Sequence, residues 1–304
     1  MYLFIEQTFN GVQLGLTLFL LAAGLTLVFG IMGVINLAHG SFYMVGAYAG
    51  ALVAKATGSF WLAVPAALGV AALVGMAVEL LIVRRLYARD HLYQVLATFG
   101  LILFFNGLFA WVFGRAPLMM DAPRALSGFI EILPGLPYPT YRLAVMAVGL
   151  VVAVGLWFII TRTRAGMLIR AGSTNRDIVG ALGVDIAKLY TLVFGFGALL
   201  AGLAGVMVGP VRSVQIGMGE QVLIMTFVVI VIGGIGSVRG AFVGAMLIGM
   251  GDTLGRAFAP TLLKLYLSGS IADGLSAALS SVLIYLIMAV VLIIRPRGLF
   301  AVGS

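Results

Sequence analysis

Long apolar stretches separated by short polar segments recur along this 304-residue chain and constrain its fold more than any other feature. About 20 apolar residues in a helix cross the hydrocarbon core of a bilayer, and a backbone exposed to lipid must satisfy its own hydrogen bonds. Nine segments are candidates: 11–31, 42–56, 60–83, 92–113, 143–160, 189–208, 222–236, 241–258 and 275–294. We therefore predict an all-α, polytopic integral membrane protein with about eight to nine transmembrane helices in one domain, 1–304.

The composition excludes several other classes of protein. Only 9% of the residues are charged, against about 25% in soluble domains, so most of the surface must face lipid or other helices. The chain has no cysteine, which excludes disulfides, thiol nucleophiles and cysteine-ligated metals. A net charge of +8 fits Lys and Arg in cytoplasmic loops and does not require a nucleic-acid partner. The first residues, with Glu6 and no basic stretch, are not expected to form a cleaved signal peptide.

Three basic segments predict the orientation. They contain Arg84, Arg85 and Arg89; five basic residues within 161–188; and Arg295 with Arg297. An even number of predicted spans separates them, so all three lie on one side, which is the cytoplasm by the positive-inside rule. The proline-rich segment 114–142 is then an external loop. The N-terminus is outside if nine segments span, and inside if the short second one is re-entrant; the short seventh raises the same question.

Glycines spaced four residues apart indicate close helix packing. They are Gly11/Gly15, Gly46/Gly50, Gly236/Gly240/Gly244 and Gly251/Gly255. This spacing lets two helix backbones approach closely. We interpret it mainly as internal packing; the alternatives are a subunit interface or a hinge.

A polar segment, Asn36-Leu-Ala-His39-Gly-Ser41, interrupts the apolar pattern near the start of the chain. Polar groups at membrane depth are costly and usually face a cavity or a partner. A histidine there can be a substrate contact, a proton relay or a hydrogen-bonded packing residue, and the residues alone favour packing. The other histidine, His91, lies in a basic loop, so no metal site is predicted. Ser41 and His39 do not share a helix face, so no catalytic pair is predicted.

Acidic residues near the apolar segments are few. Glu79 is expected to pair with Arg84 at the cytoplasmic boundary, while Glu220 and Asp252 are expected near segment ends, where water reaches them. No pair of carboxylates is expected in mid-membrane. This scarcity counts against an ion-coupled secondary transporter, which would need such groups.

The cytoplasmic loop 161–188 carries a predicted short helix. Thr174 followed by Asp177 resembles a capping box, and Gly183 suits a left-handed stop, which together predict about ten helical residues. Ile178, Val179 and Leu182 form an apolar stripe that docks either on the protein's own helix ends or in a groove of a partner. The residues divide these two alternatives evenly. The chain has no phosphate-binding loop, so any ATP would be hydrolysed by other subunits.

Four stretches carry a family resemblance. They are 29–40 (FGIMGVINLAHG) with 46–48 (GAY); Arg170-Ala171 with Asn175 and Gly183-Val184; 231–241 (VIGGIGSVRGA) after Phe227; and 295–300 (RPRGLF). With these motifs, the chain resembles the permease subunits of branched-chain amino acid ABC importers, of the LivH type, over its whole length.

The resemblance implies partners and roles. It implies a second related permease subunit, two ATP-binding subunits that bind ATP and Mg²⁺, a periplasmic substrate-binding protein, and no cofactor in this chain. The permease would lie in the bacterial inner membrane and carry branched-chain amino acids by alternating access, without being an enzyme. The alternatives are related permeases for urea or short amides and an ion-coupled secondary transporter.

The implied functional residues fall into two sets. The loop 161–188 would hold the coupling helix that contacts an ATP-binding subunit, with Arg170, Asn175, Ile178, Val179, Leu182 and Gly183 as the contact residues. Polarity and position assign a second set to the substrate pathway: Asn36, His39, Ser41, Gly233, Gly234 and Gly236.

Overall fold

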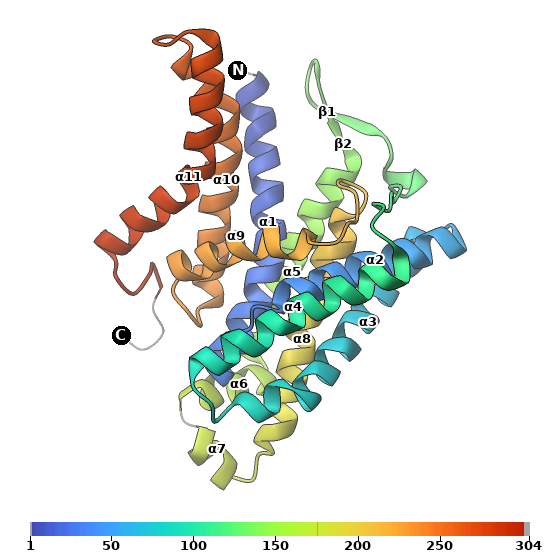
Figure 1. The fold of residues 1–304 in the computed structure, drawn as a ribbon, viewed down its shortest axis with the longest axis vertical. Helices are drawn as coiled ribbons and strands as arrows, with labels where there is room; N and C mark the ends of the chain where they lie inside the picture. The colour runs from blue at the N-terminus through green and yellow to red at the C-terminus, as the bar shows by residue number, and fades with distance from the viewer. Residues whose placement is uncertain (1, 175, 301–304) are drawn as a thin grey trace.

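The fold is a bundle of helices in a computed structural model that describes residues 2–174 and 176–300 (Figure 1). Each of the nine predicted apolar segments corresponds to one helix of the described chain, which confirms the predicted all-α fold. These helices are α1 (Tyr2–Met32), α2 (His39–Thr57), α3 (Phe60–Leu81), α4 (His91–Phe113), α5 (Thr140–Arg162), α8 (Ile186–Val208), α9 (Met218–Gly233), α10 (Val238–Leu263) and α11 (Gly269–Ile294).

Fewer helices are long and apolar enough to cross a membrane than the eight to nine spans that the sequence predicts. In the described residues, α1, α3, α4, α5 and α8 are long and apolar enough to cross a membrane. The bent pair Gly269–Ser280 and Val282–Ile294 adds a sixth if both halves form one span. The short α2 and α9 have 19 and 16 residues, and α10 carries three charged side chains. The count of eight to nine spans therefore stays a prediction.

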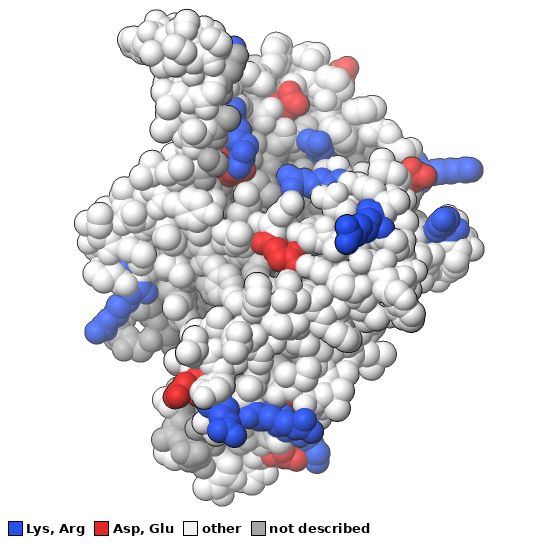
Figure 2. Space-filling model, viewed as in Figure 1, with Lys and Arg blue, Asp and Glu red and all other residues white. Residues whose placement is uncertain are grey.

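The basic segments gather at one end of the bundle, as predicted. Arg84, in the 3₁₀ helix η1 (Val83–Leu86), donates to Thr191 at the start of α8 over 2.7 Å. The Tyr190 hydroxyl donates to the Ile31 carbonyl over 3.3 Å, which places the end of α1 there too. Phe300 and Arg170 line one cavity at this end. Figure 2 shows the row of basic side chains there.

The N-terminus lies at the opposite end, together with segment 114–142. Asn10 Oδ1 accepts hydrogen bonds from Tyr138 over 3.0 Å and from Arg142 over 2.7 Å. Of the two alternatives left open by the sequence, this contact favours the one in which the N-terminus is outside.

Segment 114–142 contains a β-hairpin that the sequence analysis did not predict. Strands β1 (Phe129–Leu133) and β2 (Leu136–Pro139) pair in antiparallel fashion after a short 3₁₀ helix, η2 (Arg124–Leu126). Pro134 and Gly135 form the turn between them, and Gly135 has a φ of 83°. Proline followed by a glycine with positive φ is the signature of a type II turn, so the prolines that indicated a loop also close the hairpin.

The predicted cytoplasmic helix of about ten residues is shorter in the structure, and a helix that the sequence analysis did not predict comes before it. The structure forms α6 (Arg164–Thr174) and the six-residue α7 (Arg176–Ala181), followed by Gly183 with a φ of 88°, as predicted for a left-handed stop. Thr174 is the last residue of α6, and its predicted capping role stays a prediction. Its hydroxyl donates back to the Arg170 carbonyl over 3.0 Å, because Thr174 ends α6.

The spaced glycines pack helix against helix inside the molecule, which confirms their main interpretation. A Cβ at Gly46 of α2 would overlap the Gly202 backbone of α8, and one at Gly240 of α10 would overlap Gly233 of α9. A Cβ at Gly15 of α1 would lie 2.9 Å from a backbone oxygen of α10. These contacts bring α1, α2, α8, α9 and α10 together as the core of the bundle.

Candidate functional site

Two short helices begin inside the bundle and meet there. Gly40, in the first turn of α2, and Gly219, in the first turn of α9, face each other so closely that a Cβ on either would overlap the other's backbone. Free backbone N–H groups give a helix N-terminus a partial positive charge. Interrupted helices that meet in mid-membrane are a common way to build a transport site. The sequence analysis identified both segments as short but not their contact.

The polar segment predicted from the sequence lies at this junction and is closed off from solvent. Asn36, His39 and Ser41 are 0%, 1% and 4% exposed. The Asn36 amide makes no hydrogen bond with any described residue, and the His39 ring lies near the Leu21 carbonyl without reaching hydrogen-bond geometry. Buried polar groups are usually paired, so the unpaired ones here need an explanation. None of the three lines either of the two cavities described next.

The first cavity, called the external cavity, measures 750 Å³ and opens between α1, α9 and α10. Hydrophilic lining side chains include Gln13, Thr17, Tyr43, Arg142, Arg212, Gln221, Asp252 and Arg256, and Leu14, Val222 and Met225 are among the apolar ones. Figure 2 shows charged side chains of both signs around a hollow in the upper half of the molecule. The cavity therefore offers positive charge, negative charge and apolar wall together.

Asp252 departs from its predicted place at a segment end. It lies within α10 and is 5% exposed, although it lines the external cavity. Arg256, one turn later, places Nε and Nη2 at 2.8 and 2.7 Å from the same oxygen, Oδ1. Since both contacts use Oδ1, the structure records no partner for Oδ2 among the described residues.

Glu220 also differs from its prediction as a carboxylate that water reaches. It lies in the first turn of α9, and the Asn106 side chain of α4 donates to its Oε1 over 2.6 Å. Its Oε2 is buried and has no hydrogen-bond partner in the described chain. In the described residues, no three His, Asp or Glu side chains gather as metal ligands.

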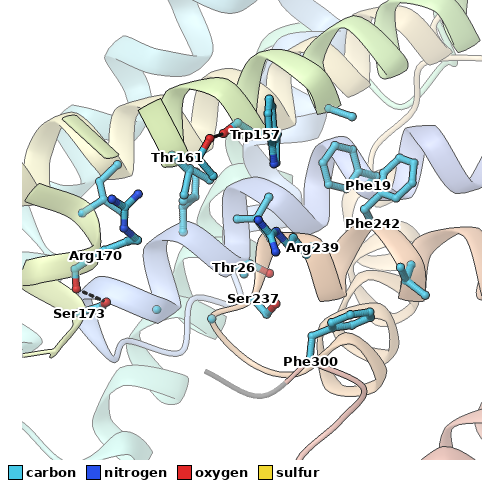
Figure 3. Close-up of a pocket in the computed structure, with 18 of the residues that line it drawn as sticks. Phe19, Thr26, Trp157, Thr161, Arg170, Ser173, Ser237, Arg239, Phe242 and Phe300 are labelled. Carbon is cyan, nitrogen blue, oxygen red and sulfur yellow. Dashed lines mark hydrogen bonds between the residues drawn. The ribbon is translucent and has the colours of Figure 1, made fainter. Parts of the chain in front are cut away.

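The second cavity, called the internal cavity, measures 630 Å³ and lies between α1, α5, α6 and α10 at the end that holds the basic segments. Figure 3 shows Arg170 and Ser173 at one end of it, Phe19 and Phe242 at the other, and Arg239 between them. Apart from Thr26, Thr161, Arg170, Ser173, Ser237 and Arg239, its lining residues are apolar or glycine.

The glycine motif predicted for the pathway borders this cavity. Gly236 lines it, with a φ of 84° and its Cα 3.1 Å from a Cβ placed at Gly30. Gly233 and Gly234 are buried beside it and anchor the end of the chain. Phe300 donates its backbone N–H to Gly233 over 2.9 Å, and a Cβ at Gly298 would lie 2.6 Å from Gly234. The sequence analysis missed this pairing of the C-terminal segment.

Some of the residues predicted to contact a partner subunit are exposed at the surface, and others are buried. Ile178 and Leu182 are 58% and 78% exposed, whereas Val179 is 5% exposed and packs inside the molecule. Gly183 ends the segment, Arg170 faces the internal cavity, and Asn175 lies outside the described residues. The apolar stripe thus contributes one residue to the protein's own interior and two to the surface.

Next to this segment, Asp185 caps the start of α8. The Lys188 backbone N–H donates to its Oδ1 over 3.1 Å, and this bond holds the pKa of the Asp185 carboxyl below its usual value. The cap sets where α8 begins and therefore where the α6–α7 segment joins the bundle.

A buried carboxylate joins α3, η1 and α8 at the same end. Glu79 is fully buried and pairs with Arg84 over 3.1 Å, as predicted. It also accepts from the Tyr87 hydroxyl over 2.5 Å and from Thr191 over 2.7 Å. The Thr191 bond joins residues 112 positions apart in the sequence, and the sequence analysis predicted neither of these last two bonds.

Comparisons with known proteins agree along nearly the whole chain. A family model described as branched-chain amino acid transport system / permease component matches residues 7–292. The high-affinity branched-chain amino acid transport system permease protein LivH of Escherichia coli (strain K12) is 29% identical, over 97% of this chain and 96% of its own. BraD of Pseudomonas aeruginosa, named for the same system, is 28% identical, over 98% and 96%. A probable LivH of Methanocaldococcus jannaschii is 25% identical, over 94% and 89%. No solved structure matches the chain.

Proposed function

Because the chain belongs to the family of branched-chain amino acid transport system permease components, we propose that it is the membrane permease of an ABC importer in the bacterial inner membrane. The family consists of transport components and not of enzymes. The proposed cargo is a branched-chain or related aliphatic amino acid. The observation that carries this proposal is the family match across 7–292, which is joined by an external cavity whose chemistry suits that cargo.

The external cavity is the proposed entrance for the amino acid. An aliphatic amino acid has a carboxylate, an ammonium group and an apolar side chain. Arg212 supplies a guanidinium for the carboxylate, Asp252 Oδ2 remains as an acceptor for the ammonium, and Leu14, Val222 and Met225 form apolar wall. Charge-assisted hydrogen bonds of this kind are stronger than neutral ones.

The buried polar segment is the proposed gate at the inner end of the external cavity. His39 begins α2 beside Gly24 of α1, and one turn later Tyr43 lines the external cavity. Farther along α1, Thr26 lines the internal cavity. Asn36, His39, Ser41, Gly233, Gly234 and Gly236 then form the pathway that is closed in this conformation. Alternating access requires a gate with a closed and an open state. In the open state, water or substrate would supply the hydrogen-bond partners that Asn36 and His39 lack in the closed state.

ATP hydrolysis is proposed to take place in partner subunits. The assembly would contain a second related permease, two ATP-binding subunits that hold ATP and Mg²⁺, and a periplasmic binding protein, with no cofactor in this chain. The exposed Ile178 and Leu182 support a helix-in-groove contact with an ATP-binding subunit. The remaining residues of the proposed coupling segment are Arg170, Asn175, Val179 and Gly183.

The test is co-purification from gently solubilised membranes that express all subunits. Ile178→Asp with Leu182→Asp is expected to leave the permease in the membrane and to release the ATP-binding subunits, because two charges would enter an apolar contact. The matched control is Leu262→Asp with Leu265→Asp, two exposed leucines at the end of α10 far from this loop. Undiminished co-purification of the first variant would refute the coupling assignment.

Substrate class is tested separately with the assembled importer in proteoliposomes. Uptake of labelled leucine should require ATP and be inhibited by excess valine or isoleucine. Inhibition by urea or acetamide instead would assign the chain to a related permease for those solutes. Uptake driven by an ion gradient without ATP would identify a secondary transporter.

A further inference from the structure

The internal cavity has a chemistry that the amino acid cargo does not explain. Arg239 and Arg170 are both exposed and line it. Neither side chain makes an ion pair or hydrogen bond within the part of the chain that the structure describes, and no described residue lining the cavity is acidic. A zwitterion held here would find no carboxylate to pair with its ammonium group. The cavity therefore matches a ligand that is anionic at one end and apolar along the rest.

A buried hydroxyl also points to a ligand with acceptor oxygens. Thr26 of α1 lines the internal cavity and is 1% exposed, yet its Oγ1 has no hydrogen-bond partner among the described residues. Ser237, at the start of α10, lines the same cavity (Figure 3). Helix N-termini favour anions, and Arg239 is the second residue of this helix. Two guanidinium groups, an unpaired hydroxyl and the start of α10, where the Ser237 hydroxyl accepts the Gly240 N–H, thus line one cavity.

The position of these groups relative to the membrane indicates which kind of anion could reach them. They lie at the end of the bundle that carries the basic segments, whereas Phe19 and Phe242 lie at the far end of the cavity from Arg170. On the α5 side, Leu150 and Val154 are 49% and 64% exposed, so this side faces the surface that meets lipid. Basic pockets between helices on the cytoplasmic side bind anionic lipid headgroups.

We propose that the internal cavity binds one anionic phospholipid from the cytoplasmic leaflet. Its phosphate lies between Arg239 and Arg170, and an acyl chain follows the groove between α5 and α10 toward Phe19. Arginine binds phosphate with short, charge-assisted hydrogen bonds. Since Arg170 belongs to α6 and Arg239 to α10, the lipid would join the cytoplasmic segment to a core helix. This inference does not depend on the transported substrate.

The experiment is native mass spectrometry of the 304-residue chain, purified in detergent and supplied with dioleoyl-phosphatidylglycerol or dioleoyl-phosphatidylcholine. We expect one phosphatidylglycerol per chain and little phosphatidylcholine. Arg239→Gln with Arg170→Gln should lower phosphatidylglycerol binding by about tenfold or more, because two charged hydrogen-bond donors are removed. Arg162→Gln is the matched control: it removes an exposed arginine at the end of α5 that does not line the cavity, and should change binding by less than about twofold.

Two further variants separate binding from folding. Arg239→Lys keeps the charge and should retain most binding, while Ala153→Trp fills the groove without changing charge and should block it. A monodisperse elution profile identifies the folded variants. Equal lipid binding by the double glutamine variant, or equal binding of the two lipids, would overturn the proposal.

Two other outcomes would identify a different occupant. Displacement of the lipid by millimolar inorganic phosphate would show a simple anion site. Loss of the lipid when the second permease subunit assembles would show that the groove is a subunit interface. Either result would overturn the lipid assignment.

Discussion

At the scale of single residues, two different physical reasons explain why a position holds glycine: there is no room for a Cβ atom, or the backbone has a positive φ. Gly46 allows α2 to touch α8, since a Cβ there would overlap Gly202. Gly183 instead has a φ of 88°, which other L-residues rarely adopt. A Cβ at Gly100 of α4 would meet no atom within 4 Å, and its φ is not positive, so neither reason applies there.

Gly46→Ala should therefore destabilise the protein by about 1–3 kcal/mol, the usual cost of overpacking a tight core. Gly100→Ala is the control and should raise stability by about 0.5–1 kcal/mol, because alanine restricts the unfolded chain more than glycine does. Thermal unfolding in one detergent measures both. Equal effects of the two substitutions would contradict the close approach of α2 and α8.

Asn36 provides a second prediction at this scale. Its amide is buried and unpaired, so Asn36→Leu should raise the unfolding temperature or leave it unchanged, since an apolar group of similar size removes the cost of burying unpaired polar atoms. The same variant should slow leucine uptake if the amide meets substrate or water when the gate opens. Normal uptake would return Asn36 to a packing role.

At the scale of elements, the helix ends near the cytoplasmic loop are joined by side chains rather than by the backbone. Glu79 of α3 is bonded to Arg84 and Tyr87 on one side and to Thr191 of α8 on the other. A buried carboxylate is stable only when its oxygens are paired. The network therefore sets the relative position of α3 and α8, close to the segment that would receive force from an ATP-binding subunit.

Thr191→Val tests this link, because valine keeps the shape and removes the hydroxyl. The expected loss is about 1–3 kcal/mol of unfolding free energy, as Glu79 Oε2 loses a donor in a buried site. Thr8→Val is the control: its hydroxyl donates to the Phe4 carbonyl of its own helix, α1, at an exposed position. A similar melting temperature for both variants would show that the Glu79 network does not hold α8.

At the scale of the whole molecule, two cavities of different chemistry lie toward opposite ends of α1 and α10. The external one carries both signs of charge, and the internal one carries only positive charge on apolar walls in the described chain. The residues at the buried junction of α2 and α9, Gly40 and Gly219, line neither cavity. Such an arrangement is expected of a permease that receives a zwitterion on one side while its pathway is closed.

Arg212→Gln and Asp252→Asn should each lower the initial rate of ATP-driven leucine uptake by about tenfold, because each removes a charged contact worth about 1.5 kcal/mol or more. Arg115→Gln, an exposed arginine of the external loop that does not line the cavity, should leave the rate unchanged. Uptake is measured in proteoliposomes containing the complete importer. Full activity of both cavity variants would exclude this cavity as the entrance.

Apolar length and spacing predict most of the elements. The nine apolar segments, the Gly183 stop, the Glu79–Arg84 pair and the packing role of the spaced glycines are confirmed, and the family model confirms the predicted family. These features depend on residues close together in the chain, or on a spacing that repeats within one helix. Local sequence carries that information directly.

Contacts between segments that are far apart in the sequence could be identified only from the tertiary structure. The meeting of Gly40 with Gly219, the bond from Thr191 to Glu79, and the burial of Asp252 beside a cavity each join residues far apart in sequence or depend on how helices cross. An apolar helix in this chain has almost no polar face to mark its orientation, because lipid and protein interior accept the same side chains. The sequence by itself therefore determined the helices, their membrane class and the family, while only helix packing decided which polar side chains line a cavity and which are buried outside both cavities.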